Sequence, residues 1–200
     1  MSKGKRNIKT DKELCEASDA LYYEIWMFNE MVKSLLTQPA QPGNPQYNAL
    51  VESFVQHMRN LIEYFYPPDN VRQDTIIAPD FFPDQNQWNK DIPKWLDDVR
   101  IKSNKLLAHL TYDRVTGYKD DKGWEYDKII EISEHLNSLF AEFLKKVPQE
   151  RIGDKLRNYK VPHVKTTGSP AFVSTGTACM NGIKVSRDMF ARAHKKTLNQ

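Results

Sequence analysis

The residues best suited to chemistry lie in a run of basic, amide and imidazole side chains from Ser103 to Arg114. His109 follows Lys102 by seven positions, so on a helix the two side chains point within about 20° of each other. A histidine beside a cation can act as a general acid or base next to a bound phosphate. The same histidine can instead be a boundary residue that is paired with a backbone carbonyl or a nearby acid. The spacing leaves both interpretations open.

A second polar group, Arg59-Asn60, lies about forty-five residues earlier, beside another apolar stripe. Arg59 can hold a phosphate through two N–H groups. It can equally pair with a nearby carboxylate and lock two helices together. The carboxylates within reach are Asp97, Asp98 and Glu63. If the two runs pack side by side, Arg59, Lys102, Asn104 and His109 share one cleft with enough polar groups to handle an RNA backbone.

Four amphipathic runs are expected to form the scaffold for these groups. Apolar residues recur at steps of three and four over about 11–37, 46–66, from 93 past 110, and 125–147. Proline or glycine clusters separate the runs, and Thr10 with Glu13 fits a capping box at the first of them. The connection 67–91 carries several large apolar residues, so we expect it to pack over the bundle. The sequence thus predicts an all-α, up-and-down bundle of four to five helices with a long loop between the second and third.

Charge divides the chain into two parts. Residues 1–147, the expected bundle domain, hold 19 Lys and Arg against 23 Asp and Glu, whereas residues 148–200 hold 10 against 3. The basic extension is expected to be partly irregular, with a short helix at about 186–197. Such an extension can serve as a nucleic-acid arm or simply as a solubilising end.

Several classes of protein do not fit the sequence. No apolar run is long enough for a transmembrane helix, and no secretory signal is recognisable, so no membrane is expected as a partner. Cys15 and Cys179 are far apart and are expected to be free thiols of a cytoplasmic protein. No metal or cofactor is expected, because the histidines lie on separate segments and no glycine-rich phosphate loop occurs. Four aromatic residues lie close together in the first run: Tyr22, Tyr23, Trp26 and Phe28. They can stack on the bases of a nucleic acid, or they can pack in the core or in a dimer interface.

Three segments together resemble HEPN-type helical proteins of bacterial and phage-associated origin. They are Arg59-Asn60-Leu-Ile-Glu-Tyr-Phe-Tyr, Ala78-Pro79-Asp80-Phe81-Phe82 and Asn104-Lys-Leu-Leu-Ala-His109-Leu-Thr-Tyr, and the resemblance covers roughly residues 45 to 115. It implies a helical bundle that dimerises. The active members of the family are metal-independent ribonucleases of toxin–antitoxin, phage-defence and CRISPR systems. Their motif is an arginine, four to six residues and then a histidine, acting at a cleft between protomers.

The motif is matched only in part. His109 corresponds to the motif histidine, but Arg100 lies nine positions before it, outside the spacing window. Asn104 has four intervening residues but is not a cation, and Lys102 has six and is a cation. Arg59 on the neighbouring helix is the other source of charge. A second match of the spacing, Arg187 with His194, lies outside the similar region and is a secondary candidate, as is Arg100.

Two functions follow as alternatives. The first is an RNA-binding or metal-independent RNA-cleaving homodimer of a toxin or phage-defence type, with RNA and an antitoxin-like protein as expected partners. Its site would comprise His109, Lys102, Asn104 and Arg59. The second is a non-catalytic helical module for interaction or dimerisation. A third alternative, an accessory bundle for nucleotide binding or nucleotidyl transfer, follows from other relatives of this fold class.

Overall fold

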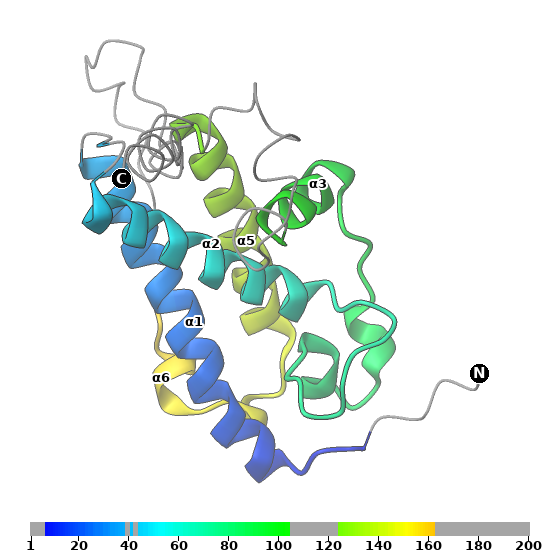
Figure 1. The fold of residues 1–200 in the computed structure, drawn as a ribbon. Coiled ribbons are helices and arrows are strands. Elements are labelled where there is room, and N and C mark those ends of the chain that lie inside the picture. Colours follow the sequence, from blue (N-terminus) through cyan, green and yellow to red (C-terminus); the bar gives the residue numbers. More distant parts are fainter. Residues whose placement is uncertain (1–6, 39–40, 42–43, 105–123, 163–200) are drawn as a thin grey trace, which may run out of the picture.

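The computed structural model describes residues 7–38, 41, 44–104 and 124–162, and within these ranges it is helical, without strands (Figure 1). The α-helices are α1 (Asp11–Thr37), α2 (Pro45–Phe65), α3 (Lys94–Ser103), α5 (Tyr126–Lys146) and the short α6 (Asp154–Arg157). Three 3-10 turns, η1 (Ala78–Phe81), η2 (Gln85–Trp88) and η4 (Gln149–Arg151), lie between them. The prediction of an all-α bundle is confirmed. The expected end of the third helix beyond residue 104 and the expected helix at 186–197 lie outside the described residues.

The start of α1 is fixed by the expected capping box. The Thr10 hydroxyl accepts a hydrogen bond from the Glu13 backbone N–H at 3.2 Å, and the Glu13 carboxylate accepts one from the Thr10 backbone N–H at 2.7 Å. The apolar stripe predicted for this helix is buried, apart from Ala17, which is half-buried against the core. Its buried members are Leu14, Leu21, Ile25, Phe28, Val32 and Leu35. The cap and the stripe therefore account for both the position of α1 and the face that it buries.

Helices α1, α2 and α5 contact one another in pairs, and α3 packs on α2 (Figure 1). Asn44 caps α2 by accepting hydrogen bonds from the N–H groups of Gln46 and Tyr47, with Pro45 in the first turn. The Phe28 and Phe54 rings stack at 5.7 Å between centroids where α1 meets α2. These contacts place the core between the three long helices. None of the described helices contains an apolar segment that could span a bilayer.

The long connection between α2 and α3 covers one end of the bundle, as expected. Phe81, Phe82 and Trp88 are buried, and all three rings pack against Phe143 of α5. The Trp88 indole N–H donates to the Phe65 carbonyl at 3.0 Å, which satisfies a carbonyl at the end of α2. Aromatic packing therefore holds this loop in place.

The packed structure continues past residue 147, beyond which the basic extension was expected to begin. Ile152 and Leu156 are buried, and η4 and α6 contact α1. The Gly153 backbone N–H donates to the Ser18 hydroxyl at 2.8 Å. Residues 148–157 are therefore part of the bundle. Their elements are too short for helical periodicity to reveal them in the sequence.

Candidate functional site

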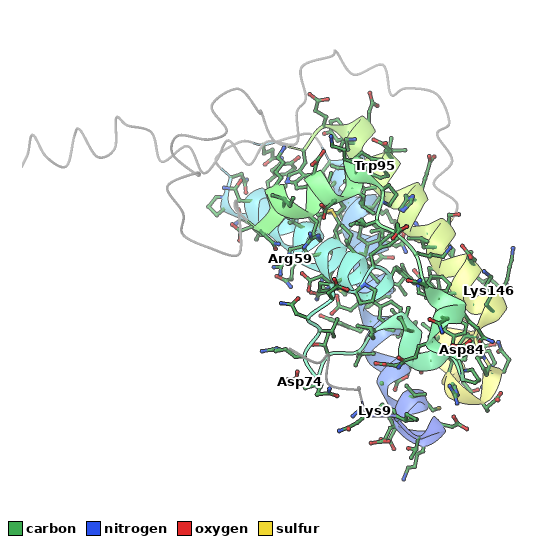
Figure 2. The ribbon with its side chains drawn as sticks, turned by 90° about the vertical axis from the view of Figure 1, so that its right-hand side faces the viewer. Lys9, Arg59, Asp74, Asp84, Trp95 and Lys146 are labelled. Atoms are coloured by element: carbon green, nitrogen blue, oxygen red, sulfur yellow. The ribbon has the colours of Figure 1, made fainter. Side chains whose placement is uncertain are left out.

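Arg59 lies on α2, beside α3 (Figure 2). One of its terminal nitrogens lies 3.3 Å from a Glu63 carboxylate oxygen, so the ion pair with Glu63, one of the expected alternatives, is present. The side chain is 20% exposed, and its Nε atom is buried without a hydrogen-bond partner. A buried N–H group without an acceptor costs roughly 1–3 kcal/mol. Arg59 thus retains a donor that an anionic oxygen would satisfy.

Asn60 follows Arg59 but belongs to a different polar cluster, on the α1 side of α2. Its amide nitrogen donates to Glu24 at 3.0 Å, and the same carboxylate oxygen lies 2.7 Å from His57 Nδ1. Consecutive helical residues point about 100° apart, which explains why the two neighbours diverge. The Glu24–His57–Asn60 cluster was not predicted from the sequence. The only signal was the spacing of three between His57 and Asn60, and the partner Glu24 depends on the register between α1 and α2.

Lys102, near the end of α3, packs on an aromatic ring. Its Nζ lies 5.1 Å from the centre of the Trp124 ring, and Trp124 is 1% exposed and T-shaped to Phe54. A cation held over an indole face is stabilised by the ring quadrupole. Lys102 is therefore in contact with the segment that leads into α5.

The other two α3 candidates, Asn104 and Arg100, have different neighbours. Arg100 donates to Asp97 through Nε at 2.9 Å and through a terminal nitrogen at 2.6 Å. Asn104 ends α3 with its backbone N–H bonded to the Arg100 and Ile101 carbonyls, and its side-chain oxygen is buried without a hydrogen-bond partner. Arg59, Lys102 and Asn104 therefore each have separate neighbours. His109, Arg187 and His194 lie outside the described residues, so the predicted pairing of His109 with Lys102 stays a prediction.

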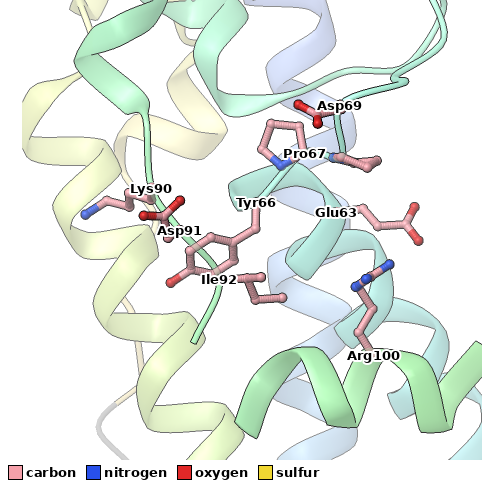
Figure 3. A pocket seen from close by; sticks show the side chains of 9 residues that line it. Glu63, Tyr66, Pro67, Asp69, Lys90, Asp91, Ile92 and Arg100 are labelled. Atoms are coloured by element: carbon pink, nitrogen blue, oxygen red, sulfur yellow. The ribbon is translucent and has the colours of Figure 1, made fainter. Parts of the chain in front are cut away.

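A half-open pocket of about 200 Å³ lies between the end of α2, the segment 90–92 and α3 (Figure 3). Its lining combines apolar and charged side chains: Glu63, Tyr66, Pro67, Pro68, Asp69, Lys90, Asp91, Ile92 and Arg100. Both cations in the lining already have carboxylate partners, since Lys90 binds Glu142 at 2.9 Å and Arg100 binds Asp97. The pocket is therefore not an electropositive site for an anion.

Tyr66, which lines this pocket, is hydrogen-bonded to His135 of α5. The phenolic oxygen lies 2.9 Å from His135 Nε2, the two rings stack, and the Trp95 ring lies edge-on to the imidazole. Burial lowers the pKa of His135, and Glu131 and Lys90 act on it in opposite directions. Burial also raises the pKa of Tyr66, as does Glu142. The imidazole is therefore neutral near pH 7, and it shares a hydrogen bond with the Tyr66 hydroxyl.

Two of the four aromatic residues of α1 are open to solvent. Tyr23 is 49% exposed and Trp26 is 40% exposed, with 6.2 Å between their ring centroids. Phe28 is in the core, and Tyr22 packs edge-on against Tyr159. The cluster predicted from sequence is thus divided between the core and an exposed aromatic pair.

Charge in the described part of the chain is predominantly acidic, with 22 Asp and Glu against 16 Lys and Arg. Among these residues no group of three His, Cys, Asp or Glu side chains is arranged to hold a metal ion. Comparison of the chain with protein-family models, curated proteins and solved structures finds no match. The resemblance to HEPN-type proteins stays a prediction.

Proposed function

We propose that the chain is a helical dimerisation module that associates with a second copy through the exposed face of α1. The observation that supports this proposal is the pair Tyr23 and Trp26, which lies in the middle of the longest described helix. Aromatic residues are enriched in protein–protein interfaces, where they contribute large contact areas. An aromatic pair that remains exposed in the monomer is therefore a candidate interface.

Electrostatics favours a protein over a nucleic acid on this face. The excess of carboxylates in the described residues repels a polyanion, whereas binding of RNA relies on lysine and arginine contacts to phosphate. The charged residues along the exposed stripe of α1 have both signs, as interface rims commonly do.

The test of the dimerisation role is the mass of the full chain in sedimentation equilibrium over a wide concentration range. We expect a monomer–dimer equilibrium, and we expect Trp26→Arg to shift it to monomer without loss of helical circular dichroism. The buried ring contacts of the core are retained, because Trp26 is 40% exposed and is not part of the core. A wild-type chain that stays monomeric at every concentration would refute the role.

RNA binding or cleavage is a second candidate function, supported by Arg59. Its buried Nε has no acceptor, and a phosphate oxygen is a suitable one. The basic residues of 148–200 would add long-range attraction. In this proposal His109 assists attack of a ribose 2′-hydroxyl on the adjacent phosphate, and Arg59 stabilises the charge that develops.

The RNA proposal is tested by binding and cleavage of single-stranded RNA, with and without a chelator and at several salt concentrations. We expect His109→Ala to abolish cleavage and Arg59→Gln to weaken binding. Arg72→Gln is the matched control, because Arg72 is exposed on the loop between α2 and η1. RNA that is neither bound nor cut by the wild-type chain under these conditions would eliminate this candidate.

A further inference from the structure

We infer that α1 pairs with α1 of a second copy in antiparallel orientation, about a two-fold axis that passes between Tyr23 and Trp26. This inference rests on the dimerisation role proposed above and specifies its symmetry and its contacts. In this arrangement Tyr23 of each copy faces the partner's Trp26, which gives two equivalent aromatic contacts.

The exposed side chains of α1 form a single stripe along the helix. At 3.6 residues per turn, the face whose centre lies between Tyr23 and Trp26 runs the whole length of α1. Its members are Lys12, Glu16, Asp19, Tyr23, Trp26, Glu30, Lys33 and Thr37, and each is exposed or half-exposed in the structure. Because this stripe is unbroken over several turns, a second helix can lie along it.

Tyr23 has one ring contact with α2. Its ring and the His57 ring are T-shaped with 5.7 Å between their centroids, and Glu24 is hydrogen-bonded to that imidazole through Nδ1. A side chain that already has a packing partner loses less conformational freedom when a second copy binds. The α2 contact therefore prepares the aromatic pair for association.

The position of the aromatic pair fits a two-fold axis. α1 spans Asp11–Thr37, so its midpoint falls at Glu24, between Tyr23 and Trp26. A 27-residue helix is about 40 Å long. If the two-fold axis passes through this midpoint, two antiparallel α1 helices contact each other over their full length. An axis near either end of α1 would leave about half of each helix without a partner.

The charges on the stripe also fit the antiparallel register. Glu16 precedes Tyr23 by seven positions, and Lys33 follows Trp26 by seven, so each Glu16 faces the partner's Lys33. The two-fold axis produces this pair twice. A parallel arrangement would instead place Glu16 on Glu16 and Lys33 on Lys33, which is unfavourable.

One pair of positions opposes like charges in this register. Asp19 faces the partner's Glu30, but Asp19 lies 3.1 Å from Lys155 and Glu30 lies 3.8 Å from Lys33 within the same chain. Lys155 offsets the charge of Asp19 and so reduces the repulsion, while Lys33 is shared between Glu30 and the partner's Glu16. The Glu16–Lys33 pairs are therefore the charges that set the orientation.

A charge exchange tests the register. We expect Glu16→Lys alone and Lys33→Glu alone each to raise the dimer dissociation constant roughly threefold to thirtyfold at low salt, because each change creates like-charge contacts twice. The double variant Glu16→Lys/Lys33→Glu restores both contacts with opposite sign and should return to within about threefold of wild type. Sedimentation equilibrium of the full chain measures all four constants.

Glu134→Lys and Lys145→Glu, alone and combined, are the matched controls, because they make the same charge changes at exposed positions of α5. We expect them to leave the dissociation constant unchanged. If the double α1 variant is as weak as the sum of its singles, or if the α5 changes have the same effect, the antiparallel register is overturned while dimerisation stands. A wild-type chain that is always monomeric overturns both.

Discussion

Tyr66 and His135 connect the end of α2 to the middle of α5 through a hydrogen bond of 2.9 Å between the phenolic oxygen and Nε2. Burial lowers the pKa of His135, so the imidazole is neutral near pH 7. The neutral form matters for stability, since protonation of His135 would place a charge in a partly buried site.

We expect the free energy of unfolding to decrease as the pH falls below the ordinary histidine pKa of about 6.5. The pKa of His135 is lowered in the folded protein, so in this window the unfolded chain binds more protons than the folded chain. The stabilisation is complete above pH 6.5 and declines towards the lowered folded pKa. Urea unfolding at about pH 7.5, 6.5 and 5.5 measures this slope.

His135→Gln should flatten the slope between about pH 7.5 and 5.5, because the titrating group is gone. Tyr66→Phe is the control: it removes one hydrogen bond and lowers stability by about 1 kcal/mol, but the slope remains. Equal slopes in wild type and His135→Gln would show that another group is responsible.

Tyr64 lies one helical turn from Asn60 and has a hydroxyl that is buried without a hydrogen-bond partner. The residue is 5% exposed, and its ring packs against Phe65, Phe81 and Phe143. Replacing it by phenylalanine keeps the ring contacts and removes the unsatisfied oxygen. We expect Tyr64→Phe to leave the free energy of unfolding unchanged or to raise it by up to about 1 kcal/mol.

Thermal and urea unfolding of Tyr64→Phe beside Tyr66→Phe provides the comparison. The two variants lose the same atom at positions two residues apart, but of the two hydroxyls only that of Tyr66 has a partner in the described structure. If Tyr64→Phe lost as much stability as Tyr66→Phe, the Tyr64 hydroxyl would have to be hydrogen-bonded in solution.

The long helices were predictable because their stripes and caps are local signals. The expected limits of 11–37 coincide with α1, and the limits expected for α2 and α5 differ from the observed ones by one residue at each end. For α2 the shift arises because Asn44 is the cap and Pro45 opens the helix. Periodicity over five or more turns leaves little freedom in such cases.

The candidate site was less predictable because it depends on how helices pack. The Arg59–Glu63 pair is four positions apart on one helix and could be anticipated, whereas the contact of Glu24 with His57 and Asn60 requires the register of α1 against α2. The spacing along α3 could not reveal that Lys102 would pack on Trp124. Contacts between distant segments therefore account for most of what the sequence did not predict.

A buried pair of amides illustrates such a distant contact and provides a third prediction. Asn29 and Asn137 exchange side-chain hydrogen bonds of 3.1 and 2.9 Å, and Tyr159 and Ser133 extend the network. Either alanine variant leaves the other amide without its partner in the core. We expect Asn29→Ala and Asn137→Ala each to lower the free energy of unfolding by about 2–3 kcal/mol.

The double variant Asn29→Ala/Asn137→Ala should cost less than the sum of the singles by about 1–2 kcal/mol, since the second change removes a group that is already unsatisfied. Urea unfolding of wild type, the two single variants and the double variant gives the four free energies of this double-mutant cycle. Asn86→Ala, at an exposed position of η2, is the control and should change stability by less than about 0.5 kcal/mol. Additive costs would indicate that the amides do not interact.

The contact of Gly153 with Ser18 holds residues 148–157 on α1 and leads to the last prediction. A Cβ added at Gly153 would lie 3.2 Å from the Ser18 hydroxyl oxygen, which is fixed because it donates to the Cys15 carbonyl at 2.6 Å and accepts from Gly153 N–H at 2.8 Å. The φ angle of −75° at Gly153 suits any residue, so Gly153→Ala adds no backbone strain to this close contact. We expect Gly153→Ala to lower the free energy of unfolding by about 1 kcal/mol.

In a Ser18→Ala background the crowded oxygen is absent, and the same change should become neutral or stabilising by up to about 1 kcal/mol, because alanine restricts the unfolded chain. Urea unfolding of wild type, the two single variants and the double variant measures the effect of Gly153→Ala in each background. An equal effect in both backgrounds would mean that the Ser18 hydroxyl is not what crowds a Cβ at position 153.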